Sequence, residues 1–184
     1  TAYEIRPRDW SSDVCSSDLI EALARVLKAG SPVVFLLGGS AMSPRGQRAA
    51  ARIATVSKSR FYSETFPARA ARGGGLPDID RLPYFPEAAM KAFEGVAQVV
   101  LAGALAPVAY FGYPGLPSRL APEEKVTLLA EPGEDADAAL EALAEALGAP
   151  ASAAGVTPSP YVVAEGALSP QSIGRVLSNA LPEG

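Results

Sequence analysis

The sequence predicts an α/β fold, a Rossmann-like parallel sheet with helices on both faces, followed by a trailing helix. Three observations lead to this prediction. Short apolar runs alternate along the chain with segments whose apolar residues recur every three or four positions. The runs are continuous, which is typical of strands that are buried on both faces. Strands and helices in alternation form parallel sheets with right-handed crossovers.

Four short segments are predicted to form the strands. The clearest of them is PVVFLL, which is unbroken and ends at a pair of glycines. In chain order the predicted strands are Pro32–Leu37, Phe61–Ser63, Gln98–Ala102 and Val126–Leu129.

The helices are predicted from apolar periodicity and from the residues at their ends. The first begins near Ile20 and stops at Gly30. The helix Glu134–Leu147 has the most regular buried stripe, and its first residues are acidic, which favours a helix N-terminus. Two further helices begin at proline, a residue favoured at the first helical position, and span Pro44–Val56 and Pro86–Phe93.

The last part of the chain is predicted to lie outside this domain. Small residues and proline from Gly148 to Glu165 indicate a linker. A last helix is predicted over Ser169–Ala180, with Ser169 as its N-cap. Its apolar face has no evident surface to pack on. We interpret this helix as the start of another domain that is cut off.

Two long irregular stretches interrupt the pattern. Residues 65–85 are rich in proline, glycine and arginine, and such a connection is usually functional or forms an interface. Its arginines, Arg69, Arg72 and Arg81, either bind an anion or are solvated or paired at an interface. The second stretch, residues 103–122, contains the aromatic sequence YFGYPG.

The turn after the first strand resembles a nucleotide-binding turn. Gly38 and Gly39 end the strand, and Gly46 follows inside the next helix. Glycine lets a backbone approach a pyrophosphate, and a helix N-terminus supplies N–H donors. Glu64 follows the next strand, where a ribose-binding carboxylate would lie. The spacing differs from G-x-G-x-x-G, so a tight turn without a ligand is the alternative interpretation.

Composition excludes several classes of function. The formal net charge of −4 comes without a basic patch, so nucleic acid is not an expected partner. No apolar run approaches the ~18 residues that a membrane span needs, and a cytoplasmic location is expected. Histidine is absent, which excludes Ser-His-Asp and Cys-His catalysis and His-ligated zinc within this chain.

Residues 9–19 (DWSSDVCSSDL) are identical to the in-frame translation of a common short-read sequencing adapter. The segment has neither helical nor strand periodicity, and it holds the only Trp and the only Cys of the chain. We interpret residues 1–19 as artefactual or unassigned and expect the domain to begin near Ile20. Residues 9–19 are expected to be exposed, with few core contacts. An ordinary polar loop is the alternative.

Several motifs follow one another in a recognisable order: Lys28–Gly39 (KAGSPVVFLLGG), Glu64–Arg69 (ETFPAR), Arg81–Pro86 (RLPYFP), Pro107–Gly115 (PVAYFGYPG) and Leu129–Ala136 (LAEPGEDA). In this order they resemble the central domain of thiamine diphosphate-dependent enzymes of the acetolactate synthase and benzoylformate decarboxylase type. More narrowly, they resemble acetolactate synthase large-subunit homologues. Residues 166–182 resemble the opening helix of the C-terminal, diphosphate-binding domain of that family.

The resemblance implies that residues 20–150 are the central domain, and that 151–184 are a linker and the start of the C-terminal domain. In the family, thiamine diphosphate lies between the N-terminal domain, which holds the activating glutamate, and the C-terminal domain. The C-terminal domain binds Mg²⁺ through a Gly-Asp-Gly…Asn motif. Neither the glutamate nor the motif is present here, so no catalytic and no metal-ligating residue is expected in this chain.

The central domain of the family has a six-stranded sheet that binds FAD in some members. Gly38, Gly39 and Glu64 are the candidate cofactor-binding residues here. We expect a fragment of a thiamine diphosphate-dependent 2-keto acid carboligase or decarboxylase, whose partners are the remaining domains of a homo-oligomeric parent protein. The alternative is a free-standing Rossmann-like module that binds a nucleotide or a flavin.

Overall fold

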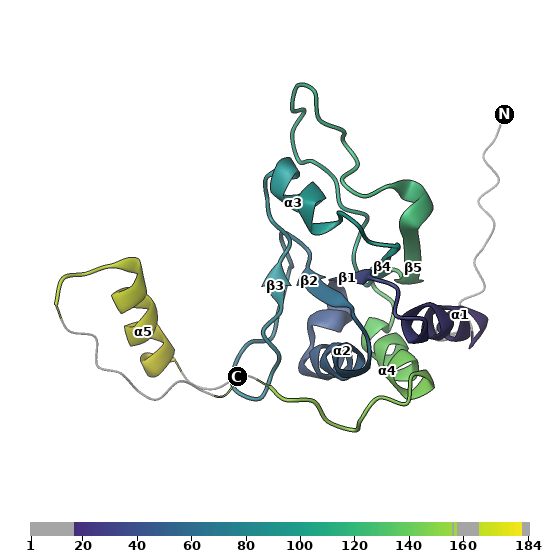
Figure 1. The fold of residues 1–184 in the computed structure, drawn as a ribbon. Helices are drawn as coiled ribbons and strands as arrows, with labels where there is room; N and C mark the ends of the chain where they lie inside the picture. Colours follow the sequence, from purple (N-terminus) through teal and green to yellow (C-terminus); the bar gives the residue numbers. More distant parts are fainter. Residues whose placement is uncertain (1–16, 156, 158–165, 182–184) are drawn as a thin grey trace.

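The structure is a computed structural model that describes residues 17–155, 157 and 166–181 (Figure 1). At its centre lies a five-stranded parallel sheet with the order β3-β2-β1-β4-β5. The predicted α/β fold is therefore confirmed. The described part of the chain forms five strands, where the family resemblance implies six. The strands are β1 (Val33–Leu37), β2 (Arg60–Ser63), β3 (Asp80–Arg81), β4 (Gln98–Ala102) and β5 (Val126–Ala130).

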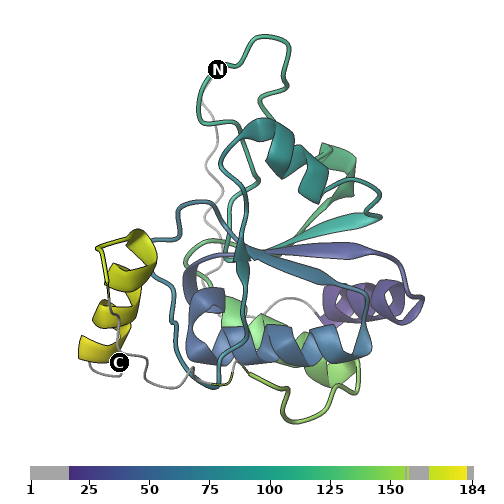
Figure 2. The ribbon, with the colours of Figure 1, turned by 60° about the vertical axis from the view of Figure 1, so that its left-hand side comes forward.

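Helices cover both faces of the sheet, as predicted. Figure 2 shows α1, α2 and α4 on one face and α3 on the other. The α-helices are α1 (Ser17–Lys28), α2 (Pro44–Val56), α3 (Pro86–Ala92), α4 (Ala136–Ala146) and α5 (Pro170–Ala180). Two 3-10 turns, η1 (Gly39–Met42) and η2 (Glu123–Lys125), precede α2 and β5.

The sheet separates two hydrophobic cores. Phe35 and Leu37 of β1 point into the core under α1, α2 and α4, whereas Val34 and Leu36 point into the core under α3. All five residues of β1 are buried, because the strand lies in the middle of a sheet that is covered on both faces. This arrangement explains why the first predicted strand is a continuous apolar run.

Of the last three residues of the N-terminal segment, Ser17 and Asp18 are exposed, as expected, whereas Leu19 contacts the core. The first helix begins at Ser17 rather than near Ile20, and Leu19 packs against the larger core. The helix extends in this direction because Asp18 in its first turn interacts favourably with the helix dipole. Residues 9–16 lie outside the described part of the chain.

Other boundaries also differ from the prediction. Residues 65–85 are not wholly irregular, because Asp80 and Arg81 pair with β2 as the edge strand β3. Two residues give no periodicity, so only the neighbouring strand defines them. Helix α4 begins at Ala136 rather than Glu134, since Asp135 is its N-cap, and it ends one residue early.

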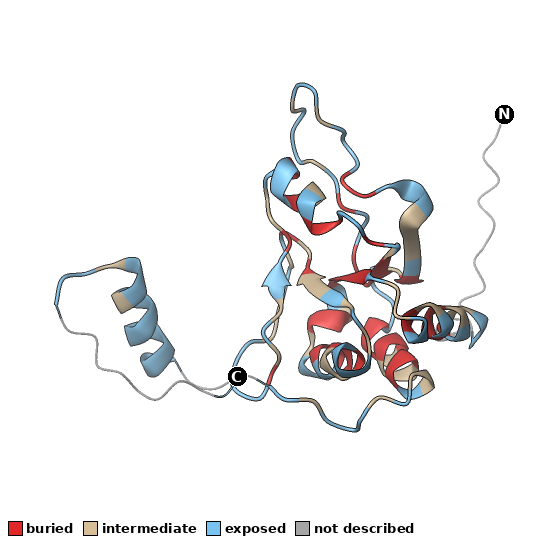
Figure 3. Ribbon diagram, in the orientation of Figure 1, coloured by how far each residue is buried: buried red, intermediate tan, exposed pale blue. Residues whose placement is uncertain are grey.

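Helix α5 starts as predicted, with Ser169 as N-cap in a capping box and Pro170 in the first turn. None of its residues is buried, and Figure 3 shows the helix exposed along its length. Its apolar residues Ile173, Val176 and Leu177 are between 45% and 53% exposed. Among the described residues, no helix is long and apolar enough to cross a membrane.

Candidate functional site

The first strand leads into a 3-10 turn before α2 begins. Ser43 is the N-cap of α2, and its hydroxyl accepts a hydrogen bond from the Gly46 amide (3.1 Å). Pro44, the first helical residue, has no amide hydrogen. The N-terminus of α2 therefore offers a ligand fewer amide donors than an uncapped helix would.

The strand order reverses between β1 and β4, and two glycines meet at this point. The Gly38 amide donates a hydrogen bond to the Ala102 carbonyl (3.0 Å). A Cβ on Gly38 would lie 2.6 Å from the Gly103 carbonyl oxygen, and a Cβ on Gly103 would lie 2.6 Å from that of Gly38. The backbone of the chain itself is thus sufficient reason for glycine at both positions.

Glu64 lies beside this glycine contact. Its amide donates to the Leu37 carbonyl (2.9 Å), which fixes the backbone at the end of β2. Its carboxylate oxygen Oε1 lies 3.0 Å from the place that a Cβ on Gly38 would take. Partial burial raises the pKa of the Glu64 carboxyl above its ordinary value. The structure thus brings Gly38 and Glu64 together at the carboxyl edge of the sheet.

A cleft of about 760 Å³ opens between the η1–α2 turn and residues 69–76. Three arginines line it: Arg48 from α2, and Arg69 and Arg72 from the long loop. Gly39 and Ser40 belong to its wall, and none of its lining residues is acidic. An excess of guanidinium groups in a concave surface favours anionic ligands, above all phosphate and carboxylate. We refer to this surface as the arginine cleft.

Two serines connect the turn to α4. The Ser40 hydroxyl accepts from the Ala136 amide (2.9 Å) and donates to the Glu134 carbonyl (3.1 Å). The Ser43 hydroxyl donates to a carboxylate oxygen of Asp137 (3.2 Å). These bonds fix the position of the η1–α2 turn, which forms one wall of the arginine cleft.

A pair of carboxyl groups lies behind this wall. A hydrogen bond with Asp137, together with burial, raises the pKa of Asp135. Burial acts to raise the pKa of Asp137 too. The hydrogen bond from Asp135, the charge of Arg45 and the Ser43 hydroxyl outweigh it and lower that pKa. Asp137 is therefore the more acidic member of the pair.

Only one of the three candidate cofactor-binding residues lines the arginine cleft. Gly39 lines the arginine cleft. Gly38 and Glu64 lie at the contact with Gly103 and are not among the residues that line the cleft. A role of any of the three in binding a cofactor remains a prediction.

The three loop arginines do not all line the arginine cleft. Arg69 and Arg72 line the arginine cleft, whereas Arg81 belongs to β3 and does not. The sequence analysis missed Arg48, because an arginine on the polar face of a helix is usually solvated and gives no distinguishing signal. Its position, one helical turn after the Ser-Pro start of α2, is the feature that could have indicated it.

A second exposed surface is aromatic, and we call it the aromatic surface. The rings of Phe66 and Tyr110 are 5.0 Å apart, and those of Tyr84 and Tyr110 are 5.9 Å apart and nearly parallel. The ring centroids of Phe85 and Tyr84 are 5.3 Å apart. These side chains come from both long irregular stretches, and Phe66 remains 59% exposed. Exposed apolar groups in such a cluster are typical of a surface that contacts another protein segment.

The described residues offer no cluster of side chains that could hold a metal ion. No three His, Cys, Asp or Glu side chains gather into a metal-binding group in the described part of the chain. A Mg²⁺ site needs oxygen ligands at short distances in octahedral geometry.

The chain is similar to a curated protein of Mycobacterium tuberculosis (strain ATCC 25618 / H37Rv), named "Putative acetolactate synthase large subunit IlvX". The two are 44% identical over 163 residues, which cover 88% of this chain and 31% of the relative. This chain thus spans about a third of the length of the relative. No protein-family model matches the chain.

Two solved structures share the fold. One is described as a "putative thiamin diphosphate-dependent enzyme" of Mycobacterium smegmatis (TM-score 0.58, 21% identity), with 92% of this chain and 36% of the other covered. The other is a thiamine diphosphate-dependent 4-hydroxybenzoylformate decarboxylase of Rhodococcus jostii RHA1 (TM-score 0.55, 21% identity), with 89% and 33% covered. This chain therefore has the fold of about one third of each of these larger proteins.

Proposed function

We propose that this chain is the central domain of a thiamine diphosphate-dependent, acetolactate synthase-like enzyme, with the first helix of the following domain attached. The observation that carries this proposal is the 44% identity to the mycobacterial relative over 88% of the chain. In the parent protein, thiamine diphosphate and Mg²⁺ support decarboxylation of a 2-keto acid, followed by carbon–carbon ligation or protonation. The chain itself is a scaffold without catalytic residues.

Two exposed apolar surfaces support the further proposal that other domains of the parent contact this one. The first is the aromatic surface around Tyr84 and Tyr110. The second is the face of α5 that contains Ile173, Val176 and Leu177. Apolar groups exposed on a soluble domain are costly unless a partner covers them. Assembly of the parent as a homo-oligomer and a cytoplasmic location belong to the same proposal.

Calorimetry with thiamine diphosphate and Mg²⁺ tests the assignment. The chain is expected to bind neither, because it has neither the activating glutamate nor the metal motif. Sequencing the source locus beyond the codon for Gly184 gives a second test, which does not depend on folding. The reading frame is expected to continue into a Gly-Asp-Gly…Asn motif. Saturable micromolar binding by the chain alone, or a frame without that motif, would overturn the assignment.

A second candidate function is binding of FAD or another nucleotide, either within the parent or as a free-standing module. The arginine cleft favours it, since three guanidinium groups and the Gly39 turn line one concave surface. A diphosphate there would gain charge-assisted hydrogen bonds. Arg72→Gln is expected to weaken FAD and pyrophosphate binding about tenfold, the effect of one such bond. Arg81→Gln, a loop arginine outside the cleft, is the matched control and is expected to change nothing.

The Gly39→Val variant tests the turn itself. Gly39 has a φ of +49°, so valine adds backbone strain as well as bulk, and thermal stability must be measured alongside affinity. If the variant folds and binds FAD as tightly as the unmodified chain, the ligand does not use this turn.

A further inference from the structure

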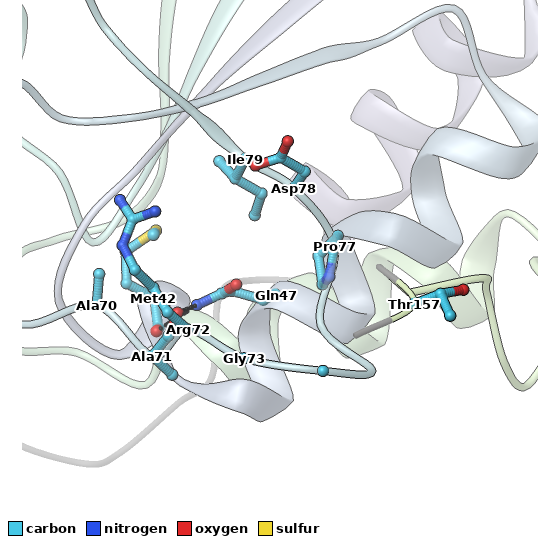
Figure 4. Close-up of a pocket in the computed structure, with 11 residues that line it drawn as sticks. Met42, Gln47, Ala70, Ala71, Arg72, Gly73, Pro77, Asp78, Ile79 and Thr157 are labelled. Atoms are coloured by element: carbon cyan, nitrogen blue, oxygen red, sulfur yellow. Dashed lines mark hydrogen bonds between the residues drawn. The ribbon is translucent and has the colours of Figure 1, made fainter. Parts of the chain in front are cut away.

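A second cavity, of about 320 Å³, lies next to the arginine cleft. The two share Met42 and the loop from Ala70 to Gly74. Figure 4 shows the second cavity between this loop and the segment from Pro77 to Ile79, with Gln47 of α2 at its base. Ligand sites usually measure ~300–1,000 Å³, so this cavity suits a small metabolite rather than a dinucleotide. We call it the small pocket.

The base of the small pocket is fixed before any ligand binds. Gln47 is 2% exposed, and its Nε2 donates to the carbonyl oxygens of Met42 (2.9 Å) and Ala71 (2.7 Å). The Ala71 amide also donates to the Met42 carbonyl (3.0 Å). These three bonds hold the loop against α2. A wall that is already in place lowers the entropic cost of binding.

Two opposite charges lie on facing walls of the small pocket. Arg72 belongs to the loop, and Asp78 belongs to the segment across the cavity (Figure 4). Both side chains are exposed, and neither makes an ion pair or a hydrogen bond within the part of the chain that the structure describes. The arginine cleft differs, because no acidic residue lines it. A guanidinium and a carboxylate together favour a ligand that carries both charges, and the carboxylate disfavours a diphosphate.

The rest of the small pocket is largely apolar. Met42 is 4% exposed, and Ile79 packs against the larger core, so both present fixed apolar surface to the cavity. Pro77 and, from the linker, Thr157 complete the lining on the far side. Each methylene group that a ligand buries on such a surface raises its affinity about fourfold. The pocket thus combines two charges with room for an aliphatic chain.

We propose that the small pocket binds a small zwitterion, an α-amino acid with an aliphatic side chain. The ligand carboxylate would pair with Arg72 and its ammonium group with Asp78, while its side chain would lie against Met42 and Ile79. This inference goes beyond nucleotide binding in the arginine cleft and does not rest on it. Because Arg72 borders both cavities, the two kinds of ligand would compete for its guanidinium.

A titration with matched ligands tests the proposal. The backbone amide resonances of residues 70–79 are followed by nuclear magnetic resonance at pH 7, with L-norleucine, hexanoate and pentylamine as ligands. Hexanoate is norleucine without its ammonium group, and pentylamine is norleucine without its carboxylate. Each is expected to bind about fivefold more weakly than norleucine, the upper effect of one exposed ion pair. Glycine, which has no aliphatic chain, is expected to bind about tenfold more weakly.

Two variants assign each charge to its partner. Both side chains are exposed and unpaired in the described part of the chain, so their replacement is not expected to disturb folding. Arg72→Gln is expected to weaken norleucine binding about fivefold and to leave pentylamine binding unchanged. Asp78→Asn is expected to weaken norleucine binding by the same factor and not to weaken hexanoate binding. Asp80→Asn, an exposed carboxylate of β3 outside the pocket, is the matched control.

The outcomes separate this proposal from nucleotide binding. If norleucine does not bind, or if norleucine, hexanoate and pentylamine bind equally well, the assignment of the small pocket is wrong. Weaker pentylamine binding by Arg72→Gln would likewise contradict the pairing. Pyrophosphate is titrated in parallel. Pyrophosphate binding without norleucine binding supports the arginine cleft alone, whereas norleucine binding without pyrophosphate binding supports the small pocket alone.

Discussion

The close contact between Gly38 and Gly103 gives the sharpest test of how this sheet is built. Gly38 has an extended backbone, with φ −144° and ψ −179°, so an alanine there meets no torsional strain. Its added Cβ would nevertheless lie 2.6 Å from the Gly103 carbonyl oxygen and 3.0 Å from the Ala104 Cα. Backbone atoms cannot turn away as a flexible side chain can. Gly38→Ala should therefore destabilise the fold by about 1–3 kcal/mol, the usual cost of overpacking.

Substitutions at three other glycines distinguish the cost of steric overlap from the cost of backbone strain. Gly95 has a φ of +70° but open space, so Gly95→Ala should cost about 1–2 kcal/mol from torsion alone. Gly103 combines a φ of +66° with the overlap, so Gly103→Ala should cost about 2–5 kcal/mol, the sum of the two effects. Gly112 has neither feature, and Gly112→Ala should change stability by less than about 0.5 kcal/mol.

Urea unfolding followed by circular dichroism at the helical band measures all four variants. The loss of stability should be smallest for Gly112→Ala and largest for Gly103→Ala. The ranges for Gly95→Ala and Gly38→Ala overlap, but Gly38→Ala must lose clearly more stability than Gly112→Ala. Equal stability of these two variants would refute the argument that the backbone of the chain requires glycine at 38. The two adjacent glycines of the turn would then need another explanation, for example contact with a ligand.

Three further predictions concern the core, the buried charge and the last helix. Phe35→Ala should cost about 3–5 kcal/mol in urea unfolding, because Phe35 is fully buried, whereas Phe66→Ala on the aromatic surface should cost less than about 1 kcal/mol; equal losses would contradict the assignment of the core. Asp137→Asn should cost about 1–3 kcal/mol at pH 7 through weaker bonding to Ser43 and Arg45. Because the pKa of Asp137 is lowered, this stabilisation is present above the unfolded pKa of about 3.9 and is lost as the pH falls through the folded value. The difference between wild type and variant should therefore shrink below pH ~4, and a difference independent of pH would contradict it. Amide hydrogen exchange should be much faster in α5 than in α4, since α5 buries no residue and an isolated short helix is marginal in water; strong protection of α5 would show that it has a partner surface.

Much of the fold follows from local patterns in the sequence. The continuous apolar run that became β1 predicted a central strand of a parallel sheet, because only a strand covered on both faces needs apolar residues at every position. Helix α2 begins and ends where predicted, since Ser43 and Pro44 give a local start signal that needs no tertiary contact. Helix α5 was predicted for the same reason, from Ser169 and Pro170.

Other features depended on contacts between distant segments. The two-residue strand β3 exists only through its pairing with β2, and its residues show no periodicity of their own. The pair Gly38 and Gly39 was interpreted as a nucleotide-binding turn, yet Gly38 packs against Gly103, which is far away in the sequence. A local motif cannot show whether the space that a glycine leaves is filled by a ligand or by another part of the backbone.

The sequence by itself therefore determined the α/β class, the order of the main elements and the likeness to thiamine diphosphate-dependent enzymes. Only the tertiary structure brought Arg48 of α2 to Arg69 and Arg72 of the loop, where the three line one cleft. The physical reason is that helices and strands arise from interactions between near neighbours, which periodicity records. A concave site forms where segments that are distant in the sequence cross, so the residues that line it leave no repeating pattern in the chain.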